Sequence, residues 1–86
     1  MRIHDRVAEQ LGIRIVSGDL PPGSTLPKEL EVGKELCVSR AAYREAVRIL
    51  AAKGLVKSQQ KTGTVVLPRQ RWSLLDPDVL AWMFRS

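Results

Sequence analysis

The chain of 86 residues has a single cysteine, Cys37, and a single histidine, His4. One cysteine cannot form a disulfide within the chain, which is what we expect of a protein in the reducing cytoplasm. One cysteine and one histidine also offer no set of ligands with the spacing of a metal site. No catalytic pair occurs, and Gly18, Gly23 and Gly33 lack the spacing of a phosphate-binding loop. We therefore expect no metal, no cofactor and no enzymatic activity.

Long apolar runs are missing as well. No stretch approaches the roughly 20 residues that a membrane-spanning helix requires. The first six residues lack the uninterrupted apolar segment of a signal peptide. The hydrophobic fraction of 44% is nevertheless ordinary for a folded protein. These features predict one small folded domain with no membrane partner.

Acidic side chains are scarce in the second half of the chain. Between Cys37 and Arg71 one acid, Glu45, stands among many basic residues: Arg40, Arg44, Arg48, Lys53, Lys57, Lys61, Arg69 and Arg71. The preceding residues balance their basic side chains with acidic ones. Positive charge concentrated in one half is typical of a domain that presents one surface to a phosphate backbone.

Residues 39–53 have the pattern of a helix with two different faces. The apolar residues recur at helical spacing and predict a buried face: Tyr43, Ala46, Val47 and Leu50. The opposite side carries a row of arginines: Arg40, Arg44 and Arg48. Ser39 stands where an N-cap belongs, and Gly54 stands just past the end of the helix. A helix with a packed back and an arginine row from its first turn is suited to a DNA groove.

The rest of the chain supplies the surroundings of that helix. The patterns predict a helix over residues 3–17, a short strand at 25–26, a helix over 27–36, and a hairpin of 55–59 and 64–67 around a tip at 61–63. The gap before residue 39 is so short that the two neighbouring helices must cross at a steep angle. A helix-turn-helix followed by a hairpin is a winged helix, mainly α with a small β-hairpin.

The end of the chain adds one more apolar helix. Residues 69–71 read as a linker, and Asp76 and Pro77 can begin a helix as N-cap and first residue. Its apolar residues exceed what the core of a winged helix requires: Val79, Leu80, Trp82, Met83 and Phe84. We therefore predict a DNA-binding domain over residues 1–68, and a linker and helix over 69–86 that lead to a further domain or form a dimer contact. The alternative is that this helix folds back onto the first one.

Three segments carry a resemblance to a known family. They are SGDLPPGSTLP at 17–27, VSRAAYREAVRILAAKGLV at 38–56 and KTGTVV at 61–66. Together they resemble the N-terminal DNA-binding domain of the GntR family of bacterial transcription regulators. The segment WSLLDPDVLAW at 72–82 further resembles the join to the helical effector domain of the FadR-type subfamily.

The resemblance implies a set of DNA-contacting residues. The family's helix contacts fall on Ser39, Arg40, Ala41 and Arg44, and its wing tip falls on Thr62 and Gly63. The residue chemistry agrees, because arginine can bond the guanine O6 and N7 atoms together. We add two basic residues to this set: Lys61 at the tip, and Arg48, which either reaches a phosphate or is simply solvated. The helix at 39–53 would occupy the major groove, and the tip at 61–63 would lie at the minor groove.

The resemblance also implies partners. These are double-stranded DNA with a palindromic operator, a second copy of the full-length protein, and a small effector held by a C-terminal domain. The FadR-type join indicates a sugar acid or another carboxylate as that effector. We expect the full-length protein to be a repressor in preference to an activator. Two other interpretations of the chain stay open. It is a winged helix that binds an acidic protein partner, or it is the N-terminal part of a regulator fused to an aminotransferase-like domain.

Overall fold

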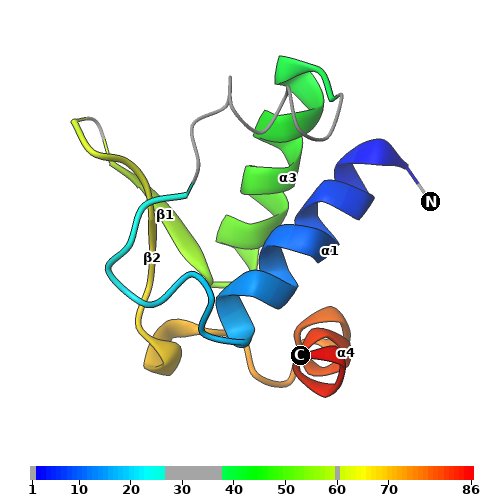
Figure 1. The fold of residues 1–86 in the computed structure, drawn as a ribbon, viewed down its shortest axis with the longest axis vertical. Coiled ribbons are helices and arrows are strands. Elements are labelled where there is room, and N and C mark those ends of the chain that lie inside the picture. Colours follow the sequence, from blue (N-terminus) through cyan, green and yellow to red (C-terminus); the bar gives the residue numbers. More distant parts are fainter. Residues whose placement is uncertain (1, 27–37, 60) are drawn as a thin grey trace.

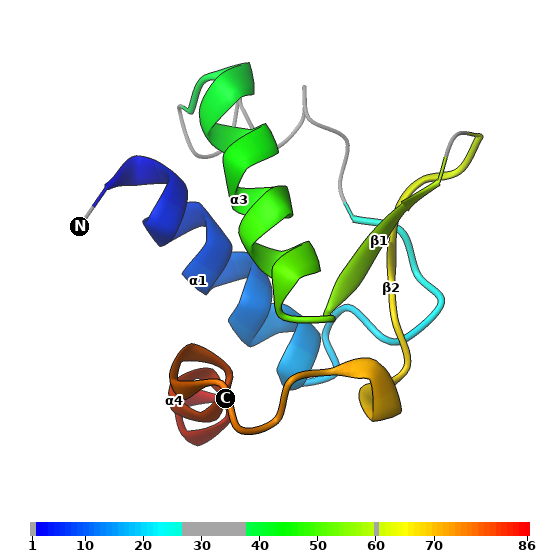
Figure 2. The same ribbon diagram turned by 180° about the vertical axis from the view of Figure 1, so that it is seen from behind.

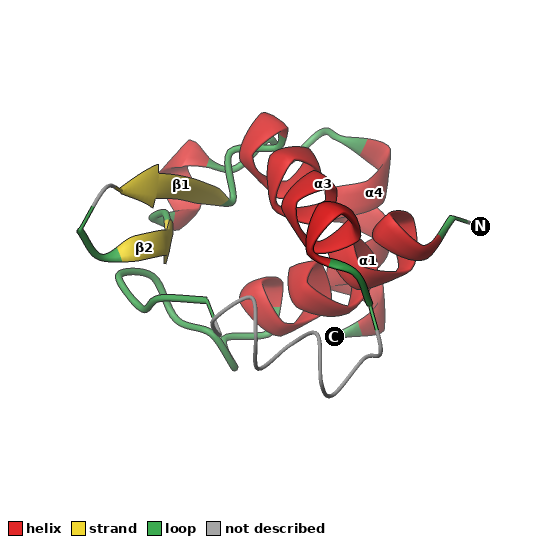
Figure 3. Cartoon of the chain, turned by 90° about the horizontal axis from the view of Figure 1, so that it is seen from above, coloured by secondary structure: helices red, strands yellow, loops and turns green. Residues whose placement is uncertain are grey.

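A computed structural model describes residues 2–26, 38–59 and 61–86. In chain order its elements are α1 (Ile3–Val16), α3 (Arg40–Ala52), β1 (Val56–Gln59), β2 (Gly63–Val66), a 3₁₀ turn (Arg69–Arg71) and α4 (Pro77–Arg85). The helices gather on one side of the molecule and the hairpin stands on the other (Figure 3). The predicted helix over 27–36 lies outside the described residues. The described helices and the hairpin follow one another in the order that the sequence predicts.

The core lies where α1 and α3 pack together and meet the base of the hairpin. The apolar stripe of α1 contributes Val7, Leu11 and Ile15, each at most 2% exposed. Across from it, Ala46 and Leu50 of α3 are fully buried. Both helices therefore turn their periodic apolar faces toward each other, as the 3.6-residue spacing predicts.

The hairpin is antiparallel, with Val56 opposite Val66 and Ser58 opposite Thr64. Gly63 closes the turn with a φ of +85°, a conformation that glycine adopts without a steric cost. The predicted short strand at 25–26 appears as a single bridge between Thr25 and Val65. This bridge joins the segment after α1 to the edge of β2 that does not pair with β1.

Both ends of α3 have the predicted capping residues. The Ser39 hydroxyl accepts a hydrogen bond from the Ala42 N–H at 3.1 Å, which satisfies a backbone donor of the first turn. At the other end Gly54 has a φ of +76°. A Cβ atom on Gly54 would also overlap the carbonyl oxygen of Arg71, so the chain after the hairpin passes directly over this glycine.

The last helix, α4, packs against α1, so its apolar face is part of the core. Val79 is fully buried and Trp82 is 5% exposed. The Trp82 ring lies against Gly12, where any Cβ would overlap it. Our expectation that the apolar residues of this helix exceed the needs of the core is therefore wrong for these two side chains. It holds for Phe84, which is 89% exposed.

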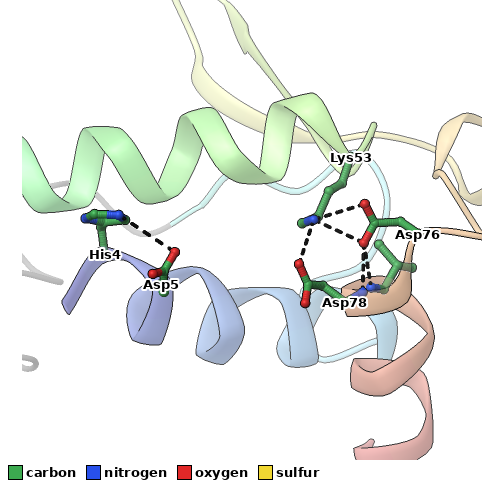
Figure 4. A network of polar contacts seen from close by, with 6 residues as sticks. His4, Asp5, Lys53, Asp76 and Asp78 are labelled. Carbon is green, nitrogen blue, oxygen red and sulfur yellow. Dashed lines mark hydrogen bonds and ion pairs between the residues drawn. The ribbon is translucent and has the colours of Figure 1, made fainter. Parts of the chain in front are cut away.

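Lys53, one of the basic residues of the second half of the chain, is the centre of an ion-pair network between α3 and α4 (Figure 4). Its Nζ atom lies 3.0 Å from an oxygen of Asp76 and 3.0 Å from an oxygen of Asp78. The same atom lies 5.7 Å from the centre of the Trp82 ring. Asp76 also caps α4 by accepting hydrogen bonds from the Asp78 and Val79 N–H groups. One lysine thus joins the end of α3 to the beginning of α4.

The network shifts the pKa values of both partners. Burial acts to raise the pKa of Asp76, but hydrogen bonds from Lys53 and the backbone, together with the charge of Lys53, lower it below its ordinary value. Burial acts to lower the pKa of Lys53, but hydrogen bonds to Asp78 and Asp76 and their charges raise it above its ordinary value. Both shifts favour the charged forms in the folded protein.

Stability should therefore fall at both extremes of pH. The lowered pKa of Asp76 contributes stability above about pH 4, and this is lost as the pH falls through the folded pKa. The raised pKa of Lys53 contributes stability below about pH 10, and this stability is lost as the pH rises through the folded pKa.

Asp76→Asn tests the role of charge, because it keeps an N-cap acceptor but removes the charge. In urea unfolding at neutral pH the variant should have a lower free energy of unfolding than the unaltered chain, and the difference should shrink as the pH falls below about 4. A difference independent of pH would contradict the role of charge.

Candidate nucleic-acid interface

The beginning of α3 presents its predicted contact residues to solvent. Ser39, Arg40, Ala41 and Arg44 are all exposed. Tyr43, one residue before Arg44, is 6% exposed and fixes this turn of the helix in the core. Arg40 and Arg44 are one turn apart, roughly 6 Å along the helix axis. That separation is about two base-pair steps, so two guanidinium groups on a rigid helix can address neighbouring bases.

Arg48 lies one turn further along the same side of α3. Its side chain is 82% exposed, and its Nε atom lies 4.0 Å from a carboxylate oxygen of Glu45. An exposed ion pair at this distance contributes little to stability. The guanidinium group can therefore exchange this carboxylate for another anion.

The tip of the hairpin holds the other predicted contacts. Lys61, Thr62 and Gly63 are all exposed. The Thr62 hydroxyl donates a hydrogen bond of 2.7 Å to the Gln59 side-chain oxygen across the tip. Figures 1 and 2 show this tip at the same end of the molecule as the beginning of α3. The structure thus places two predicted contact segments toward the same end of the molecule, with the wing tip standing away from α3 (Figure 1).

A groove between α3 and the hairpin is not among the features that the sequence predicts. It has a volume of about 400 Å³, and its lining includes Arg44, Arg48, Ser58 and Thr64. The two-residue period of the strands could have predicted one wall of this groove, because it places Ser58 and Thr64 on the same face as the buried Val56 and Val66.

The described residues contain neither a metal site nor a membrane-spanning helix. Among residues 2–26, 38–59 and 61–86, no three histidine, cysteine or acidic side chains gather as a metal ion would require. In the same part of the chain, no helix has the length and apolar character needed to cross a bilayer.

A family model described as bacterial regulatory proteins of the gntR family matches residues 3–66, which include α1, α3 and the hairpin. Two relatives come from Escherichia coli (strain K12). The uncharacterized HTH-type transcriptional regulator YieP is 46% identical over 76 residues, which are 88% of this chain and 33% of YieP. The galactonate operon transcriptional repressor is 43% identical over 82 residues, which are 95% of this chain and 36% of that repressor. The chain therefore spans about a third of the length of these relatives.

A solved structure has the same arrangement of elements. It is the crystal structure of the AraR DNA-binding domain in complex with operator ORR3. The two chains superpose with a TM-score of 0.73 at 32% identity, over 77% of this chain and 80% of the AraR chain. The winged helix predicted from the sequence is thereby confirmed.

Proposed function

The chain belongs to the gntR family of bacterial regulatory proteins, and on that premise we propose that α3 enters the major groove of operator DNA while the wing tip lies at the minor groove. The chain is the DNA-binding domain of a transcription regulator and not an enzyme. The observation that carries this docking is geometric: the exposed beginning of α3 and the exposed wing tip lie at one end of the molecule (Figure 1).

The residues at that end divide into base readers and backbone contacts. Arg40 and Arg44 read bases, because a guanidinium group can donate to guanine O6 and N7 together. Ala41 contacts a thymine methyl group. Ser39 and the N–H groups of the first turn receive a phosphate at the helix N-terminus. Lys61, Thr62 and Gly63 contact the backbone and the minor groove.

The wing residue Lys61 should act through charge alone. Lys61→Ala should weaken binding to all duplexes by a similar factor and reduce the slope of log K against log salt by about one unit. Fluorescence anisotropy at several salt concentrations measures both quantities. The matched control is Arg14→Ala, because Arg14 pairs with Asp19 near the end of α1, away from the wing. A loss confined to one sequence would instead make Lys61 a base reader.

A second part of the proposal concerns the full-length protein. We propose that residues 69–86 lead into a C-terminal effector domain of the FadR type, while α4 itself packs on α1. The relatives support a further domain, since the chain spans about a third of their length. The relative named for the galactonate operon supports a sugar acid or related carboxylate as effector, and repression as the outcome. A dimer of such a protein would bind a palindromic operator in the cytoplasm.

Selection of binding sequences from a random duplex pool tests the function. The salt concentration should be moderate, so that non-specific phosphate binding is suppressed. We expect enrichment of a half-site that contains guanine. A pool without any enriched motif, both for the chain and for two tethered copies of it, would contradict sequence-specific recognition.

A further inference from the structure

The inner face of the hairpin changes character along its length. Near the core it carries Val56 opposite Val66, and both are buried. One step toward the tip the same face carries Ser58 opposite Thr64. These hydroxyl groups replace the apolar pair at the point where the hairpin leaves the core. The face that continues beyond the core is therefore suited to a polar occupant.

The opposite wall of this groove is the side of α3 that faces the hairpin. Its apolar part comes from Val47 and Ala51, and its charge comes from Arg44 and Arg48. The groove thus combines guanidinium groups, hydroxyl groups and an apolar floor. A sugar-phosphate unit has the matching chemistry, because it joins an anionic phosphate to a largely apolar deoxyribose ring.

The docking of the domain brings such a unit to this place. One DNA backbone separates the major groove from the adjacent minor groove. A domain with α3 in the first and the wing tip in the second must therefore straddle that backbone. We propose that the groove between α3 and the hairpin holds one sugar-phosphate unit of the DNA, bound by Arg48 and the hydroxyl groups of Ser58 and Thr64. This inference rests on the proposed function and assigns the phosphate that lies between its two contact segments.

Arg48 has the freedom that this role requires. Its side chain is mostly exposed, and its 4.0 Å pair with Glu45 is weak enough to be replaced by a phosphate. Because a phosphate bears a full charge, its hydrogen bonds to a guanidinium group and to hydroxyl groups are stronger than those between neutral groups.

Neutralising single phosphates tests the inference. The chain is titrated against a set of duplexes, each with one methylphosphonate, built on the sequence that the selection enriches. For the unaltered chain, several positions should weaken binding, since Ser39 and the wing tip also contact phosphates, and one further position between these contacts should weaken it by about tenfold. That effect should fall below about twofold in Arg48→Gln, and it should shrink in the double variant Ser58→Ala, Thr64→Val. Arg48→Gln should also reduce the salt slope by about one unit.

Lys57→Gln is the matched control, since Lys57 precedes Ser58 on the same strand and loses the same charge. Because successive side chains of a strand point to opposite faces, Lys57 points away from the groove. Its variant should keep the full effect of the sensitive methylphosphonate. The inference would be overturned if no sensitive position lost its effect in Arg48→Gln and in the double variant. Failure of the unaltered chain to bind any duplex would instead overturn the proposed function.

Discussion

Replacing Trp82 with alanine is expected to lower the free energy of unfolding by about 3–5 kcal/mol, the usual cost of removing a buried aromatic ring. The ring is 5% exposed, although it belongs to the last helix of the chain. It fills the space above Gly12 and lies 5.7 Å from the Lys53 ammonium group. Its loss would open a cavity between α1 and α4. Urea unfolding followed by far-ultraviolet circular dichroism measures the change.

Phe84 provides the control, because it lies on the same helix and is 89% exposed. Phe84→Ala should change the free energy of unfolding by less than about 0.5 kcal/mol. Equal losses for the two variants would contradict the packing of α4 on α1.

The contact between Gly12 and the Trp82 ring can also be tested by substituting Gly12. Alone, Gly12→Ala should destabilise the chain, because the new methyl group overlaps the Trp82 ring. In the Trp82→Ala background the ring is gone, and alanine should stabilise α1 by about 0.5–1 kcal/mol through its higher helix propensity. The effect of one substitution thus changes sign with the other. Additive effects in this double-mutant cycle would show that the two residues do not meet.

Replacing Arg44 with alanine is expected to cost about 1–3 kcal/mol of binding free energy on the selected duplex, and to relax the preference at one base pair of each half-site. Arg44 lies in the exposed first turns of α3, beside a tyrosine that anchors the helix in the core. Titration against duplexes with each base substituted in turn measures the preference. The stability of the variant should stay close to that of the unaltered chain, since the residue is exposed.

Arg44→Lys separates recognition from charge. Lysine keeps the positive charge but cannot donate two parallel hydrogen bonds from a planar group. This variant should retain the salt slope and still lose the base preference. Unchanged preference in Arg44→Ala would contradict its assignment as a base reader, whatever happens to the affinity.

Several elements of this protein could be predicted because their causes are local. The helical period of residues 39–53 predicts which side of α3 is buried, and Ser39 and Gly54 predict where the helix begins and ends. Gly63 predicts the turn of the hairpin, since its backbone adopts a positive φ. The exposed row of arginines follows from the same period. The candidate contacts of α3 and the wing could thus be chosen from the sequence, although their roles in binding remain proposals.

The partners of these elements depend on contacts between residues distant in the sequence. An apolar period predicts that a face is buried but not what covers it, so Trp82 could equally have met a further domain or a second copy. Gly12 reads as a weak position in a helix, whereas the structure shows it making room for a ring 70 residues later. Lys53 reads as a solvated cation because Asp76 and Asp78 are far along the chain. The amino-acid sequence alone thus determined the winged helix and its basic face. Only the tertiary structure decided that α4 belongs to the core and that a groove separates α3 from the hairpin, because both result from long-range packing.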